Sequence, residues 1–189
     1  MKANEINKLT LAGMFAALAF ICFAYLRIEI PMGGGMTGKI YIGHTFIILA
    51  AALLGSKYGA LTGAVGLSLA DFLAGYTTSA PPTFLAKFLL GYTAAFTART
   101  IFKLPNASPK KQIGIIAVSG ISACIVNVIT EPLIRYAFKV YILGMPQELA
   151  YLSAVNCAVS MAVSAVPSVI LAALLYKALY KSVFKNYQF

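Results

Sequence analysis

Long apolar runs dominate the chain, and short polar stretches or stretches with glycine and proline separate them. A helix needs roughly 20 mainly apolar residues to cross the hydrocarbon core of a bilayer, and several runs reach or approach this length. The pattern therefore predicts an all-α integral membrane protein, with residues 1–189 forming a single membrane domain. We expect six transmembrane helices, at about residues 9–26, 42–54, 58–76, 82–102, 113–138 and 148–180.

Turn-forming residues mark the breaks between these spans. Pro31 and the nearby glycines predict an irregular loop over residues 27–41. Pro81 and Pro82 suit the first turn of the fourth helix, because the N–H that a proline lacks is not used there. The second span is short, so we expect neighbouring helices to shield it. The first run has no small-residue cleavage site before a hydrophilic segment, which favours a retained span over a signal peptide.

Composition supports the membrane assignment. The chain is 60% hydrophobic and 11% charged, and its mean hydropathy is +0.84. Such a chain has too few charged side chains for a water-facing surface. The 15 Lys and Arg against 5 Asp and Glu give a net charge of +10. A chain so poor in charged residues does not build the broad basic face of a nucleic-acid-binding protein. We therefore expect contact with membrane lipid and no nucleic-acid partner.

The distribution of basic residues predicts the orientation in the membrane. If the spans alternate in direction, ten lysines and arginines fall on one side and four on the other, while Lys87 lies inside a span. Cytoplasmic loops carry the excess of basic residues, so we expect both termini to be cytoplasmic, in a bacterial plasma membrane. The ten are Lys2, Lys8, Lys57, Arg99, Lys103, Lys110, Lys111, Lys177, Lys181 and Lys185, and the four are Arg27, Lys39, Arg135 and Lys139.

The three cysteines lie within apolar runs and lack CxxC or CxxH spacing. This predicts neither a disulfide framework nor a metal site. We interpret Cys22, Cys124 and Cys157 as small packing residues, and we expect this chain to bind no cofactor.

Ionisable residues inside the spans are functional candidates, since a charge at membrane depth is costly unless it is paired or hydrated. Asp71, late in the third span, and Lys87, early in the fourth, lie at similar depth and are placed to pair across the turn. Each of them either joins two helices through a salt bridge or contacts a ligand.

A polar stripe follows the fifth span. Asn127, Glu131 and Arg135 recur every four residues and share one helix face, where Glu131 and Arg135 are spaced for an ion pair. Arg135 either snorkels to the interface or joins the site. We assign Asp71 and Arg135 to a structural ion-pairing role. Asn127 and Glu131 lie deeper and are candidate ligand residues, as is Asn156 in the sixth span.

Further candidates surround the outer ends of the spans: Arg27, Tyr41, His44 and Tyr76. The aromatic side chains either form an interfacial belt or stack on a flat ring, and His44 is either satisfied at the interface or contacts a ligand. All the informative polar residues lie in the outer half, which predicts a substrate captured from outside. A proton relay or a channel would need polar groups along the whole path.

The first span contains two overlapping pairs of small residues, Ala12 with Ala16 and Gly13 with Ala17. Small residues four apart let another helix approach closely, so this span is a candidate docking face.

Two segments carry a family resemblance. The first helix reads LTLAGMFAALAF, and spans two to four read YIGHTFIILAAALLGSKYGALTGAVGLSLADFLAGYTTSAPPTFLAKFLLGY. The second segment has a GSKYGA turn, an aspartate late in span three, a PPTF start to span four and a lysine within it. These features resemble the S components of energy-coupling factor (ECF) vitamin transporters, most closely the riboflavin-type branch that includes the hydroxymethylpyrimidine and pyridoxine group. The similarity covers nearly the whole chain.

The resemblance implies that six helices bind one vitamin in a pocket open to the outside. The residues implied to line it are Lys87, Asn127, Glu131 and Asn156, with Arg27, Tyr41 and His44 near its lid. In that family the first helix meets the coupling helices of a T component, which two ABC-type ATPases drive. By position, this implies docking through Ala12, Gly13, Ala16 and Ala17. ATP is then used by partner subunits, and the chain has no GxxxxGK[ST] loop.

The polar candidates favour a small, neutral or weakly basic ring of the hydroxymethylpyrimidine or pyridoxine class over a large anion such as folate. Two other functions stay open. A membrane-embedded enzyme for a lipid-like substrate would use Asp71 or Glu131 with His44, but the chain has one histidine and no HExxH. A self-sufficient secondary transporter would usually show related halves or broken helices. We expect a transport subunit and not an enzyme.

Overall fold

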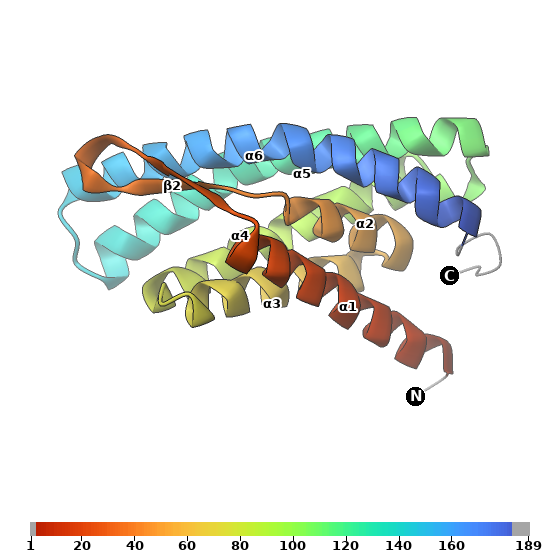
Figure 1. Ribbon diagram of the computed structural model, residues 1–189, viewed down its shortest axis with the longest axis horizontal. Coiled ribbons are helices and arrows are strands. Elements are labelled where there is room, and N and C mark those ends of the chain that lie inside the picture. Colours follow the sequence, from red (N-terminus) through yellow and green to blue (C-terminus); the bar gives the residue numbers. More distant parts are fainter. Residues whose placement is uncertain (1–2, 183–189) are drawn as a thin grey trace.

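The computed structural model describes residues 3–182, and six α-helices with one β-hairpin form the described part (Figure 1). Two π-helical segments, η3 (Phe96–Ile101) and η5 (Phe138–Ile142), continue α4 and α5. The α-helices are α1 (Ala3–Tyr25), α2 (His44–Leu54), α3 (Ser56–Leu73), α4 (Ala80–Ala95), α5 (Pro109–Ala137) and α6 (Gln147–Ser182).

These helices fall where the six spans are predicted, so the all-α prediction is confirmed. Among the described residues, three helices are long and apolar enough to cross a membrane: Glu5–Tyr25, Pro109–Ile142 and Gln147–Leu179. Helix α2 is apolar but shorter. Every residue of α2 except Phe46 is buried, which confirms that neighbouring helices shield it. That all six helices cross the membrane stays a prediction.

The expected irregular loop between the first two spans is wrong. Strand β1 (Ile28–Pro31) pairs antiparallel with β2 (Thr37–Ile40), with Glu29 opposite Lys39. The 3-10 turn η1 (Gly33–Gly35) joins them, and Gly35 adopts a positive φ of 70° that glycine accepts without strain. Ile28 and Ile30 alternate with polar or turn residues, which suits a strand. This pattern is only four residues long, and the glycines that follow it favour the prediction of a loop.

Small residues bring the helices close together. A Cβ added at Gly91 on α4 would lie 2.7 Å from the carbonyl carbon of Gly59 on α3, and one added at Gly66 would lie 2.6 Å from the carbonyl oxygen of Ala16. The Thr62 hydroxyl also donates to the Ala12 carbonyl, at 3.3 Å. Helices α1, α3 and α4 therefore pack backbone against backbone.

This packing divides the four residues of the predicted docking face on α1 into two pairs. Ala12 is buried, and Ala16 packs against α3, so this pair serves contacts within the chain. Gly13 and Ala17 are exposed, and nothing lies within 4 Å of a Cβ added at Gly13. Gly13 and Ala17 are therefore the more accessible pair for a partner helix, whereas Ala16 is half-buried.

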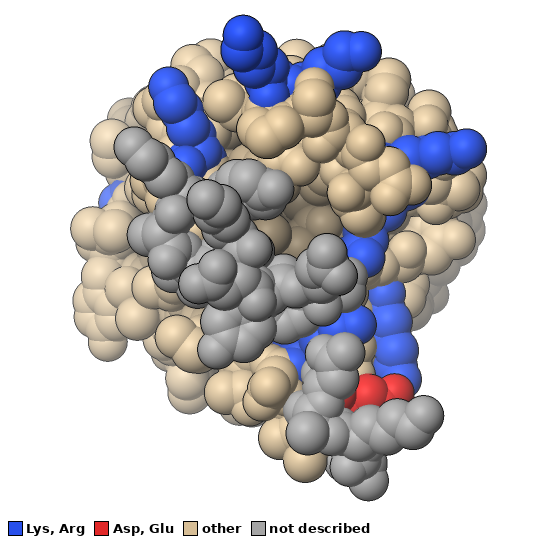
Figure 2. All heavy atoms as spheres, turned by 90° about the vertical axis from the view of Figure 1, so that its right-hand side faces the viewer, with Lys and Arg blue, Asp and Glu red and all other residues tan. Residues whose placement is uncertain are grey.

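Both ends of the described chain lie at the same end of the molecule, and the hairpin lies at the opposite end (Figure 1). Figure 2 shows that lysines and arginines gather around the end with the termini. This clustering agrees with the predicted division of basic residues, of which Lys2 and Lys185 lie outside the described residues. Which end faces the cytoplasm stays a prediction.

Candidate functional site

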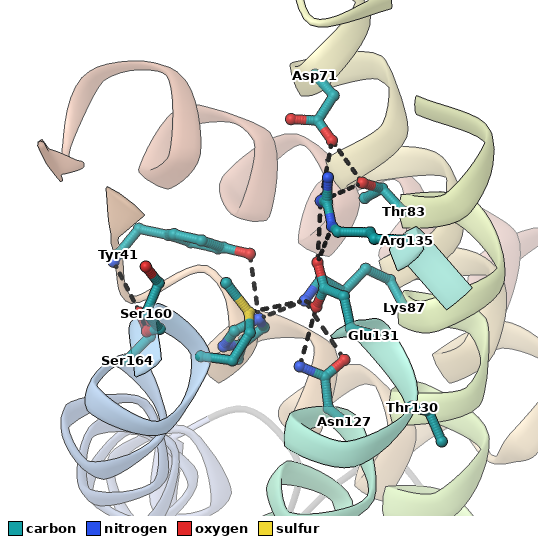
Figure 3. Close-up of polar contacts among 12 residues, drawn as sticks. Tyr41, Asp71, Thr83, Lys87, Asn127, Thr130, Glu131, Arg135, Ser160 and Ser164 are labelled. Carbon is teal, nitrogen blue, oxygen red and sulfur yellow. Dashed lines mark hydrogen bonds and ion pairs between the residues drawn. The ribbon is translucent and has the colours of Figure 1, made fainter. Parts of the chain in front are cut away.

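Glu131 is the centre of a buried polar network (Figure 3). Its side chain is fully buried on α5. Oε2 accepts hydrogen bonds from Lys87 Nζ and from Asn127 Nδ2 (3.1 Å), and Oε1 accepts from Arg135 Nε (3.1 Å) and Nη2 (3.0 Å). The stripe predicted on the fifth span therefore faces the protein interior. Two cations and an amide compensate the carboxylate, as a buried charge requires.

Lys87, fully buried on α4, joins four helices. Besides Glu131 and the Asn127 Oδ1 (3.4 Å) of α5, its Nζ contacts His44 Nε2 (2.9 Å) of α2 and Met161 Sδ (3.4 Å) of α6. An ammonium has three donors and no acceptor, so these contacts account for its hydrogen-bonding capacity. Lys87 is therefore saturated by protein groups.

His44 extends the network to Tyr41. The Tyr41 hydroxyl lies 3.2 Å from His44 Nε2, the same atom that faces Lys87. Because the Lys87 ammonium donates to Nε2, the imidazole proton resides on Nδ1, which has no hydrogen-bond partner among the described residues. The rings of Tyr41 and Phe23 also pack in a T-shaped arrangement, with centroids 5.0 Å apart.

Arg135 connects this network to α3. Its Nη2 donates to Thr83 Oγ1 (2.7 Å) and lies 3.6 Å from Asp71 Oδ2, and the Thr83 hydroxyl donates to Asp71 Oδ2 (2.5 Å). The pairing of Asp71 with Lys87 suggested by the sequence is wrong. The α4 residue that faces Asp71 is Thr83, one helical turn before Lys87. The cation that pairs with the Asp71 carboxylate is Arg135 and not Lys87.

A cavity of about 340 Å³ lies above the network, between the hairpin and the helix ends. Helices α3, α4, α5 and α6 form its walls, and β2 with the end of η1 closes one side. Its lining residues are Phe23, Gly35, Met36, Thr37, Gly38, Lys39, Tyr41, Leu67, Asp71, Tyr76, Ser79, Thr83, Arg135, Lys139, Ser153, Asn156, Cys157, Ser160 and Met161.

The predicted binding residues divide into two groups. Tyr41, Tyr76 and Asn156 line the cavity, and so do Asp71 and Arg135, which the sequence analysis treats as structural. The network residues Lys87, Asn127, Glu131 and His44 are buried and do not line it, and Arg27 instead pairs with Glu29 at 2.8 Å.

Sequence reasoning assigned no ligand role to several polar side chains on the cavity wall, among them Lys39, Lys139 and Thr83. For Lys139 a signal was present, because it continues the four-residue spacing beyond Arg135. Thr83 follows Pro82 in the PPTF segment, whose prolines predict a helix start but indicate no ligand contact. Nothing in the sequence indicated that Lys39, within an expected loop, faces a cavity.

Two kinds of contact hold the hairpin over the cavity. On one side Lys39 Nζ lies 2.9 Å from the centroid of the Tyr76 ring, a cation–π contact. On the other side Asn156 Nδ2 donates to the Gly33 carbonyl (3.2 Å), and the Tyr41 N–H donates to Ser164 Oγ (3.3 Å). The hairpin is thus tied to α6 and to the turn between α3 and α4.

Burial lowers the pKa of Lys39 to about 8. Arg27 and Arg135 also lower this pKa, while Asp71 and Glu29 act in the opposite direction. At neutral pH Lys39 therefore stays mainly protonated.

A second cavity, an apolar groove of about 510 Å³, lies between α5 and α6. Its walls are aliphatic apart from Cys124, so it offers no charged group to a polar ligand. Among the described residues, no group of three or more His, Cys, Asp or Glu side chains is arranged to hold a metal ion. The polar cavity beneath the hairpin is therefore the candidate site for a polar small molecule.

Solved structures share this fold. The chain resembles ThiT from Listeria monocytogenes, with a TM-score of 0.66, 18% identity, and 96% of this chain and 97% of that chain covered. It also resembles the S component of a bacterial ECF transporter (TM-score 0.64, 23% identity, 95% and 99% covered). The S component for biotin from an ECF-type ABC transporter gives a TM-score of 0.58 at 18% identity, with 94% of each chain covered. No curated protein sequence matches the chain significantly.

The six helices and the hairpin therefore have the fold of solved S components. Residues 3–181 match the family model described as the ECF-type riboflavin transporter S component, so the chain belongs to this family. It is a multi-pass membrane protein and a transport subunit, and its family is not one of enzymes.

The buried network generates a stability prediction. Replacing Lys87 by Met leaves Glu131 with one cation fewer, and breaking a buried ion pair typically costs about 3–5 kcal/mol. We expect Lys87→Met to lower the midpoint of thermal unfolding strongly in detergent. The double variant Lys87→Met/Glu131→Gln should lose less free energy of unfolding than the sum of the losses in the two single variants. The reason is that Glu131→Gln removes the carboxylate charge that Lys87→Met leaves uncompensated.

Arg27→Gln is the matched control, because it breaks the partly exposed pair with Glu29, a type of contact worth about 0–1 kcal/mol. If Lys87→Met lowered the unfolding midpoint no more than Arg27→Gln, the network would not stabilise the helix bundle as described.

Proposed function

We propose that this protein captures a small B vitamin or vitamin precursor, of the hydroxymethylpyrimidine or pyridoxine class, in the cavity beneath the hairpin. The ligand then passes inward when the protein reorients in the membrane. The observation that carries the proposal is a polar cavity at the hairpin end of an S-component fold, with Arg135, Asn156 and Tyr76 on its walls.

The size of the cavity supports a small ligand. Its volume of about 340 Å³ lies at the lower end of the ~300–1,000 Å³ typical of ligand pockets. A single substituted ring fits such a volume better than a large, multi-ring vitamin. Aromatic side chains on the wall, Phe23, Tyr41 and Tyr76, suit the faces of a flat ring.

The position of the cavity supports capture from outside. The hairpin that lines the cavity lies at the end of the molecule opposite the two ends of the described chain (Figure 1). Lysines and arginines gather around that opposite end, away from the hairpin (Figure 2). Basic residues mark the cytoplasmic side of membrane proteins, so the termini are cytoplasmic in this proposal and the cavity faces outward.

Import needs partners in this proposal: a T component in the membrane and two ABC-type ATPases that use ATP. The chain itself has no GxxxxGK[ST] loop for ATP. The exposed pair Gly13 and Ala17 on α1 offers the T component a surface that a helix can approach closely.

Mass spectrometry of small molecules released from the purified, unheated protein tests the ligand class. We expect a pyrimidine or pyridoxine-class compound from the native protein, and at least a tenfold smaller amount from Asn156→Ala, which removes a cavity amide and its bond to the hairpin. Thr130→Ala is the control, because Thr130 bonds its own helix at Val126 and does not line the cavity. A lipid, or no ligand after soaking with B vitamins, would contradict the proposal.

Vitamin uptake by cells that contain the partner subunits tests the docking face. We expect Gly13→Leu to reduce uptake at least tenfold without changing ligand binding, because the leucine side chain keeps a partner helix at a distance. Gly114→Leu is the matched control for a leucine placed on an open helix surface away from α1, since nothing lies within 4 Å of a Cβ added at either glycine. Equal uptake by the two variants would mean that the α1 face is not the docking surface.

A further inference from the structure

The wall of the cavity carries more cations than carboxylates. Lys39, Arg135 and Lys139 line it, and among the described residues Asp71 is the one carboxylate there. Asp71 already accepts a hydrogen bond from Thr83 and pairs with Arg135. No described carboxylate forms an ion pair with Lys39 or Lys139. The surplus of positive charge favours a ligand group of opposite charge, more strongly where water is scarce.

Arg135 has donors left for a ligand. A guanidinium carries five N–H donors in one plane, and Nε and Nη2 serve Glu131 and Thr83. No hydrogen bond from Nη1 to a described residue is present. The side chain is 18% exposed and lines the cavity. Glu131 and Thr83 hold the guanidinium in place, and the Nη1 donors are left for a ligand oxygen.

Lys139 adds a second cation beside Arg135. It lies four residues further along, in η5, and therefore one helical turn beyond Arg135 on the same face. Its Nζ donates to Ser153 Oγ at 2.5 Å, which leaves two of its three ammonium protons for other acceptors. Arg and Lys side chains together bind anionic oxygens through short, charge-assisted hydrogen bonds.

We propose that the ligand presents an anionic oxygen group, either a ring carboxylate or an ionised ring hydroxyl, to Arg135 and Lys139. This inference rests on the proposed function and narrows its ligand class. A pyridoxine-class ring carries a hydroxyl that ionises readily, whereas hydroxymethylpyrimidine has no acidic group. The two cations therefore select the pyridoxine class.

The same charges disfavour a permanently cationic ring. Such a ligand would meet three cations on the cavity wall, and the Asp71 carboxylate that faces them is already bonded to Thr83 and Arg135. Lys39 also disfavours a cationic ligand, because its ammonium is held over Tyr76 on the wall of the same cavity.

Calorimetric titration of the purified full-length protein with three probes tests the inference: pyridoxate, which carries a ring carboxylate, pyridoxine, and neutral hydroxymethylpyrimidine. We expect pyridoxate and pyridoxine to bind at least tenfold more tightly than hydroxymethylpyrimidine. Lys139→Gln should weaken pyridoxate binding about tenfold, as expected for one charge-assisted hydrogen bond, and should change hydroxymethylpyrimidine binding less than twofold. Lys139→Arg should restore most of the affinity for pyridoxate.

Lys110→Gln is the matched control, because Lys110 is an exposed lysine in the first turn of the same helix and does not line the cavity. If hydroxymethylpyrimidine bound as tightly as pyridoxate and pyridoxine, the inference would be overturned and the proposed function would stand. An equal effect of Lys139→Gln on the affinities for all three probes would have the same meaning. If none of the three rings bound the native protein, the proposed function would fail and the inference with it.

Discussion

A carboxylate buried away from water is stable only when cations and hydrogen-bond donors surround it, and Glu131 meets this condition with Lys87, Arg135 and Asn127. Each partner fixes a different part of the bundle. Lys87 brings α4 against α2 and α6, while Arg135 reaches Asp71 on α3. One network of polar contacts therefore joins five helices, and the cavity lies directly above it.

The site has two layers with different roles. In the lower layer, the ion pair of Lys87 and Glu131 is neutral, fully buried and saturated by protein groups. In the upper layer, Arg135 and Lys139 face the cavity and keep unused donors. Arg135 belongs to both layers, because Glu131 holds one part of its guanidinium while another part lies at the cavity. The lower layer thus orients the group that the upper layer offers to a ligand.

The sequence predicted much of this arrangement through spacing. Apolar runs located the helices, and the four-residue interval of Asn127, Glu131 and Arg135 placed them on one face. Spacing along one helix does not tell which residue of another helix faces it, so the predicted pairing of Lys87 with Asp71 was wrong. The same limit explains why Ala12 and Ala16 were assigned to a docking face, although they pack against α3. The sequence placed Glu131 deeper than Arg135 but did not indicate where the cavity ends, and only Arg135 lines it.

A structure of the protein with its ligand bound tests the central claim most directly, because it measures which layer the ligand contacts. Our account predicts the ligand in the cavity beneath the hairpin, with one of its oxygens within hydrogen-bonding distance of Arg135 and Lys139. Beneath it, Lys87 should still be bound to Glu131. A ligand in direct contact with Lys87 Nζ, with its ion pair to Glu131 broken, would contradict the account.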